Sequence, residues 1–78
     1  MSAENAHILV VDDDDRLRDL LKKYLSDNGF GVTAAEDTKA ARAKMASVAF
    51  DLIVLDLMMP NETGLEFAAS LRQSGSPV

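Results

Sequence analysis

Residues 7–15, His-Ile-Leu-Val-Val-Asp-Asp-Asp-Asp, form an apolar run that ends on carboxylates and is the most informative part of the chain. A second run of this kind, Asp-Leu-Ile-Val-Leu-Asp-Leu-Met-Met-Pro, occupies residues 51–60. Uninterrupted Ile, Leu and Val without polar alternation are typical of a strand covered on both faces, as in a parallel sheet. The two runs therefore predict two buried parallel strands, the second being the most apolar segment of the chain and, we expect, its most buried strand.

Acidic side chains follow both predicted strands. Because parallel strands bring their carboxyl ends to one edge of the sheet, where ligands bind, we expect Asp12, Asp13 and Asp56 to lie together. Two carboxylates 4 Å apart repel by about 4 kcal/mol at an effective dielectric constant near 20. A hard cation that prefers oxygen ligands, such as Mg²⁺, would offset that repulsion. The sequence predicts a magnesium site of a kind suited to phosphoryl chemistry.

Composition limits the class of protein. The 78 residues suffice for one small domain, and the 47% hydrophobic and 27% charged content is that of a globular chain. The net charge of −5 argues against nucleic-acid binding by this segment. Cysteine is absent and His7 is the only histidine, so disulfides and a histidine-built zinc site are excluded, and we assign His7 no function.

The chain shows no membrane or secretion signal. No apolar stretch is long enough to span a bilayer, and the first six residues lack the basic and apolar regions of a signal peptide. We therefore expect a cytoplasmic protein without a membrane partner.

An apolar helical stripe follows the first strand. Five apolar residues have the spacing of one face of an amphipathic helix, and we expect them in the core. They are Leu17, Leu20, Leu21, Tyr24 and Leu25. We expect Asp14 and Asp15 to act as a helix cap and a solvated first-turn residue, and Gly29 to end the helix in a left-handed conformation.

The rest of the chain repeats the alternation of strand and helix. A short strand is expected at 30–35, a helix capped by Asp37 or Thr38 and running to about residue 48, a strand at 51–56, and a helix from Gly64 to about residue 74. This order predicts an α/β fold with a doubly wound parallel sheet. If the first strand lies centrally between the other two, Asp12, Asp13 and Asp56 flank the crevice where such sheets bind ligands.

The residues that end the strands also carry a resemblance. Val-Val-Asp-Asp at 10–13, with Asp-Leu-Met-Met-Pro-Asn-Glu-Thr-Gly at 56–64, resembles the receiver domain of two-component response regulators. Asp-Arg-Leu-Arg-Asp-Leu-Leu-Lys-Lys-Tyr-Leu at 15–25 looks most like the OmpR-type transcriptional regulators. The resemblance implies a flavodoxin-like fold, truncated to about three strands and three helices. Residues 1–78 would be a partial receiver domain that includes the start of a fourth strand.

The resemblance also implies roles for the acidic residues. Asp56 would be the phosphoacceptor, taking phosphate from the phosphohistidine of a sensor histidine kinase. Asp13 would bind Mg²⁺ directly, and Asp12 directly or through water. The domain would take part in its own phosphorylation without being a turnover enzyme, and would control an output domain, expected to bind DNA, that is absent from this chain.

Further roles fall on the loop after the third strand. By the same resemblance, the main-chain carbonyl of Met58 would bind the metal, and Pro60 and Gly64 would shape the loop. Glu62 and Thr63 are expected to be exposed loop residues near the site that could modulate it.

Two family positions lie beyond Val78, namely a Ser or Thr after the fourth strand and a Lys after the fifth. Without a fourth strand, one edge of the third would be unpaired, and unpaired apolar edges promote association. We therefore expect a homodimer or a swapped oligomer through that edge.

Two other functions stay open. One is a truncated, receiver-like interaction module that is not phosphorylated. The other is a haloacid-dehalogenase-like phosphatase, since Asp12 and Asp14 have the Asp-x-Asp spacing of those enzymes.

Overall fold

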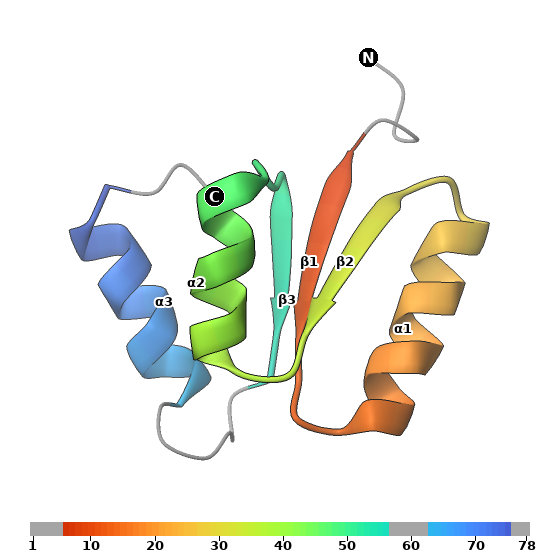
Figure 1. Ribbon diagram of the computed structural model, residues 1–78, viewed down its shortest axis with the longest axis horizontal. Coiled ribbons are helices and arrows are strands. Elements are labelled where there is room, and N and C mark those ends of the chain that lie inside the picture. The colour runs from red at the N-terminus through yellow and green to blue at the C-terminus, as the bar shows by residue number, and fades with distance from the viewer. Residues whose placement is uncertain (1–5, 57–62, 76–78) are drawn as a thin grey trace.

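The computed structural model describes residues 6–56 and 63–75. Three strands alternate with three helices (Figure 1): β1 (His7–Val11), α1 (Asp15–Asp27), β2 (Gly31–Ala35), α2 (Thr38–Ser47), β3 (Leu52–Leu55) and α3 (Gly64–Gln73). The strands are parallel and lie in the order β2-β1-β3. The predicted α/β arrangement is confirmed, and the condition that the first strand lies in the centre is met.

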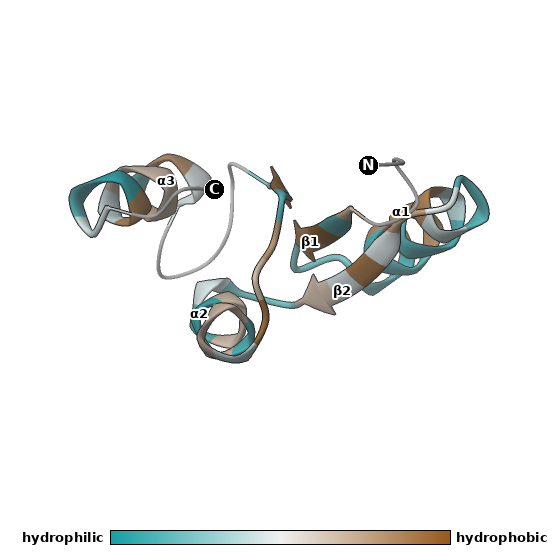
Figure 2. Cartoon of the chain, turned by 90° about the horizontal axis from the view of Figure 1, so that it is seen from above, coloured by the Kyte–Doolittle hydropathy of each residue, from teal (hydrophilic) through white to brown (hydrophobic). Residues whose placement is uncertain are grey.

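Helices cover both faces of the sheet. Figure 2 shows α1 on one side of the strands and α2 with α3 on the other. The main core lies on the α2 and α3 side, where Leu9 and Val11 of β1 meet Phe67 of α3. This core also contains Ala35, Ala41 and Phe50, with Ala40, Met45, Val48, Ile53, Leu55 and Leu71 packed against it.

The most buried strand among the described residues is β1, and the expectation that the third strand would be the most buried was wrong. Leu9, Val10 and Val11 of β1 have no exposed surface, whereas Leu52 of β3 is 53% exposed. β1 has a neighbouring strand on each side, while β3 lies at an edge of the described sheet. An apolar sequence alone does not distinguish a central strand from an edge strand.

The apolar stripe on α1 is also less buried than expected. Leu21 and Leu25 are half-buried, but Leu20 and Tyr24 are each 62% exposed, and α1 has no fully buried residue. The helix packs against β1 and β2, so only part of its broad stripe meets the sheet. The prediction of a core stripe was therefore wrong for Leu17, Leu20 and Tyr24, all of which are exposed.

Side-chain caps define where the helices begin. Asp14 caps α1 and Asp37 caps α2, as predicted, and Gly29 follows α1 with φ at 90°. The capping box at α3 was not predicted. The Thr63 hydroxyl accepts a hydrogen bond from the Glu66 amide, and the Glu66 carboxylate accepts one from the Thr63 amide. Thr63 is therefore a half-buried cap instead of an exposed loop residue. No helix in the described ranges is long and apolar enough to cross a membrane.

The only histidine has a structural environment. His7 is half-buried at the start of β1, with its Nε2 atom 2.9 Å from the Thr33 hydroxyl. Its ring meets the Phe50 ring edge-on, at 4.9 Å between centroids. These contacts lie at the opposite end of the strands from the aspartates that follow β1 and β3.

Candidate metal centre

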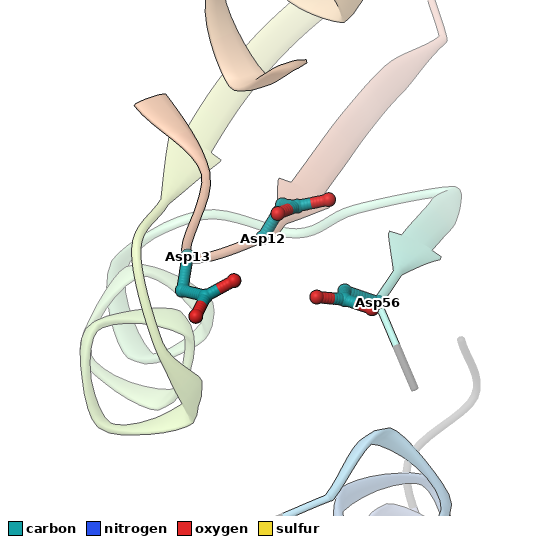
Figure 3. Close-up of side chains that lie close together, drawn as sticks. All are labelled: Asp12, Asp13 and Asp56. Carbon is teal, nitrogen blue, oxygen red and sulfur yellow. The ribbon is translucent and has the colours of Figure 1, made fainter. Parts of the chain in front are cut away.

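Three carboxylates gather where β1 and β3 end (Figure 3). One oxygen from each of Asp12, Asp13 and Asp56 lies within 4.8 Å of the others. Asp12 is buried, Asp56 is half-buried and Asp13 is exposed. The structure thus brings together the three side chains whose convergence the parallel-strand argument predicted.

The parallel ladders explain this placement. Val11 is the register partner of Leu55, and one residue further the Asp56 amide donates to the Val11 carbonyl at 2.9 Å. On the other side of β1, the Asp12 amide donates to the Ala35 carbonyl at 3.1 Å. Both acids are therefore held by main-chain hydrogen bonds that continue the sheet one step past the strands.

Asp12 is held by its side chain as well. Its Oδ1 atom accepts a hydrogen bond from the Asp14 amide at 2.8 Å, closing a turn of the kind that Asp favours. The residue is 7% exposed, so the loop between β1 and α1 is anchored on a nearly buried carboxylate. A buried, fixed acid in this position is well suited to hold a ligand.

The donor set fits a hard divalent cation. Two carboxylates at such a separation repel each other by about 3–4 kcal/mol at an effective dielectric constant near 20, and by much less where solvent screens the exposed Asp13. Three carboxylate oxygens within 4.8 Å of one another are hard donors of the kind that Mg²⁺ prefers. An ion held by Asp12, Asp13 and Asp56 would offset the repulsion between them.

Neighbouring acids do not belong to the cluster. Asp14 uses its Oδ1 atom to accept the Arg16 and Leu17 amides at 2.9 and 3.2 Å, as a helix cap. Asp15 is exposed and forms an ion pair with Arg18. Both therefore serve the start of α1, in agreement with their predicted roles as cap and solvated first-turn residue.

The loop after β3 is only partly described. Gly64 is buried at the start of α3, directly after the capping residue. The metal-binding carbonyl and the loop-shaping and modulating roles expected of Met58, Pro60 and Glu62 lie outside the described residues.

One residue near the site was missed by the sequence argument. Arg18 lies within the predicted first helix, where the sequence assigns it no role, yet its side chain is only 16% exposed and its Nη1 atom donates to the Asp12 carbonyl at 2.8 Å. The available signal was its spacing, because Asp15 and Arg18 are three residues apart at the start of a helix.

Comparison with known proteins gives the family. Residues 8–78 match the response regulator receiver domain family, and the chain belongs to that family. Protein PetR of Rhodobacter capsulatus is 53% identical over 72 residues, covering 92% of this chain and 30% of PetR. Transcriptional regulatory protein ResD of Bacillus subtilis is 44% identical over 66 residues, covering 85% of this chain and 28% of ResD. The chain thus spans about 30% of the length of these curated relatives, which are OmpR-like response regulators.

Solved structures agree. Response regulator TrrA of Thermotoga maritima, in a complex with Mg²⁺-BeF, is 40% identical with a TM-score of 0.83, over 90% of this chain and 61% of TrrA. TrrA in a complex with the histidine kinase ThkA is also 40% identical, with a TM-score of 0.82, over 88% of this chain and 60% of TrrA. The flavodoxin-like receiver fold is confirmed. The family match and the capping role of Asp14 leave the haloacid-dehalogenase alternative without support.

Proposed function

We propose that Asp56 accepts a phosphoryl group from the phosphohistidine of a sensor histidine kinase in the cytoplasm of a bacterium. The observation that carries the proposal is the convergence of Asp12, Asp13 and Asp56 within 4.8 Å at the carboxyl ends of β1 and β3. Family membership supports it, and so do the two structures of the similar protein TrrA, one with Mg²⁺-BeF and one with the histidine kinase ThkA.

Asp12, Asp13 and Asp56 would hold Mg²⁺ together with the main-chain carbonyl of Met58. All of these donors are oxygen atoms, which Mg²⁺ prefers, and a site with few protein ligands leaves coordination positions for water and phosphate. When bound, the ion would supply positive charge against the phosphoryl oxygens. Pro60 and Gly64 would shape the loop that presents this side of the site.

The transfer needs little from the protein beyond position. A carboxylate oxygen of Asp56 forms a bond to phosphorus as the bond between phosphorus and the kinase imidazole breaks, and the electron pair stays on that nitrogen. The product is an acyl phosphate on Asp56. Since a carboxylate is a weak nucleophile, rate depends on alignment, which the hydrogen bond from the Asp56 amide to Val11 helps to set.

The phosphorylated domain would act on an output domain, and it would not be a turnover enzyme. We propose that residues 1–78 form the N-terminal part of a receiver domain whose whole protein regulates transcription. The name of one relative, Transcriptional regulatory protein ResD, supports this. The net charge of −5 argues that any DNA binding belongs outside this segment.

The exposed edge of β3 favours a second candidate, a receiver-like interaction module that is not phosphorylated. A groove along β3 and α3 is lined by five apolar residues and two charged ones, namely Leu52, Ile53, Leu55, Ala68, Leu71, Asp51 and Arg72. β3 has a paired strand on one side only within the described sheet. We propose that a second copy of the chain covers this edge, because strand edges and apolar side chains favour pairing with another strand.

Beryllofluoride binding separates the two candidates. It is titrated with Mg²⁺ into the 78-residue chain and into Asp56→Asn, and amide chemical shifts are followed by NMR. The phosphoacceptor proposal expects saturable shifts around the three aspartates in the unsubstituted chain only. Shifts that are absent, or the same in both chains, would leave the interaction module as the better account.

A further inference from the structure

The guanidinium of Arg18 makes two contacts around the loop between β1 and α1, one with Asp12 and one with Asp15 at the start of α1. Its Nη1 atom donates to the Asp12 carbonyl at 2.8 Å, and its Nη2 atom forms an ion pair with the Asp15 carboxylate. The Arg18 side chain is 16% exposed, whereas that of Asp15 is 83% exposed. The arginine is thus largely enclosed and directed at the main chain of the loop that carries two of the three clustered carboxylates.

We propose that Arg18 is a positioning residue for the metal centre: it fixes the peptide between Asp12 and Asp13, so that both carboxylates face Asp56 before an ion binds. This inference rests on the proposed function, since it concerns the same three acids. Arg18 would not bind the ion itself, and would affect its binding only by holding the main chain of the residues that do.

The hydrogen bonds of Asp12 show why one more contact matters. Its amide is held by Ala35 and its Oδ1 atom by the Asp14 amide. The carbonyl held by Arg18 belongs to the planar peptide that joins Asp12 to Asp13. Fixing that peptide plane limits the direction in which the exposed Asp13 side chain leaves the main chain. Arg18 therefore restrains Asp13 without touching its carboxylate.

Charge and position make opposite contributions to cation affinity. Arg18 brings a positive charge close to a site proposed to bind a cation, and on charge alone its removal would strengthen Mg²⁺ binding. If Arg18 instead preorganises the loop, its removal lets the ligands move and weakens binding. The direction of the change therefore distinguishes a positioning role from a purely electrostatic one.

A lysine would not replace this arginine fully. Arginine presents several N–H donors in a planar fork, which allows contact with a carbonyl and a carboxylate at once. Lysine carries the same charge on a single ammonium group. Arg18→Lys therefore keeps the charge while weakening the two-point contact.

The test is Mg²⁺ affinity of the 78-residue chain by isothermal titration calorimetry, with Arg18→Met, Arg18→Lys and the control Arg16→Met. Arg16 is an exposed arginine at the same end of α1, so its removal changes the charge to the same extent. Outer residues that orient metal ligands typically contribute 10- to 100-fold to affinity. We expect about tenfold weaker binding in Arg18→Met, an intermediate value in Arg18→Lys, and equal or tighter binding in Arg16→Met.

Each outcome decides something. Circular dichroism checks that each variant is folded, and if Arg18→Met is not folded then Arg18→Lys decides. If the unsubstituted chain binds Mg²⁺ and the folded Arg18 variants bind it equally tightly or more tightly, the positioning role is overturned and the metal centre is not. No Mg²⁺ binding by the unsubstituted chain would overturn the metal centre of the proposed function, and this inference with it.

Discussion

Asp56 combines two features that its proposed role as phosphoacceptor needs, a defined position and two neighbouring acids that are proposed to bind Mg²⁺. Its amide is hydrogen-bonded to the Val11 carbonyl, so the main chain at this residue is part of the sheet. Its side chain lies beside Asp12 and Asp13, which come from a strand more than forty residues earlier in the chain. Substitutions at these three positions should therefore change chemistry more than folding.

Asp56→Asn should abolish acyl-phosphate labelling and keep the fold. The amide is nearly the same size as the carboxylate but is not a nucleophile toward phosphorus. The measurement is intact-protein mass after incubation with Mg²⁺ and acetyl phosphate, with circular dichroism to check folding. The matched control is Asp51→Asn. Asp51 lies at the other end of β3, is exposed, and accepts a hydrogen bond from the His7 amide. Label that persists in Asp56→Asn would refute the assignment.

Asp13→Asn should separate metal binding from stability. Without Mg²⁺ this variant should be equally or slightly more stable, by about 1 kcal/mol at most, because Asp13 is exposed and solvent screens its repulsion. A ligand present at 100 times its dissociation constant stabilises the native state by about 2.7 kcal/mol. Thermal unfolding with and without saturating Mg²⁺ should show that gain in the unsubstituted chain and much less in Asp13→Asn. Equal gains in both chains would show that Asp13 does not bind the ion.

At the scale of elements, side-chain caps determine where α1 and α3 begin. Asp14 caps α1 directly after Asp12 and Asp13, and Thr63 caps α3. Each cap satisfies main-chain amides that have no partner within the helix. The beginning of α1 and two of the three clustered acids therefore belong to one short segment.

Thr63→Ala should destabilise the fold by about 1 kcal/mol, because the alanine cannot accept the Glu66 amide in the capping box. Urea unfolding followed by circular dichroism measures the change. Thr63→Ser keeps the hydroxyl and is the matched control, expected to lie near the unsubstituted chain. If both variants lose the same stability, the hydrogen bond is not the cause and loss of the threonine methyl group is the better explanation.

At the scale of the whole molecule, the sheet is asymmetric. β1 is buried from Ile8 to Val11, while β3 exposes Leu52 and borders the groove along α3. On the other face, α1 leaves Leu20 and Tyr24 largely exposed. The arrangement concentrates burial at the centre and leaves apolar surface at the β3 edge, which is where we expect association.

Sedimentation velocity tests the proposed association of two copies through β3. We expect a dimer for the unsubstituted chain and a shift toward monomer for Leu52→Lys, since a charged side chain on an edge strand opposes pairing. Leu20→Lys is the control, because Leu20 is exposed to a similar degree but lies on α1. A well-folded monomer at all concentrations in the unsubstituted chain would count against the proposal.

Much of this architecture could be predicted from local patterns. The order of elements and the meeting of Asp12, Asp13 and Asp56 follow from hydrophobic period and from the common direction of parallel strands. The caps at Asp14 and Asp37 follow from residue type and position. Each of these features depends on residue type and spacing within one segment of the chain.

The degree of burial and the contacts of long side chains depended on the packed structure. An apolar run looks the same in a central strand and in an edge strand, so the exposure of Leu52 could not be read from the sequence. A helical stripe does not show which of its members meet the sheet, and Leu20 and Tyr24 do not. The contact from Arg18 to the Asp12 carbonyl arises only when the β1–α1 turn brings the first helical turn over the strand end.

The order of strands and helices predicts that Asp12, Asp13 and Asp56 share one edge of the sheet, because the alternation of elements makes the strands parallel. Which apolar residues are buried, and that Arg18 contacts the Asp12 carbonyl, is known only from the tertiary structure. Burial and orientation depend on neighbours that are distant in the chain or on the path of a turn, and neither is encoded by local periodicity.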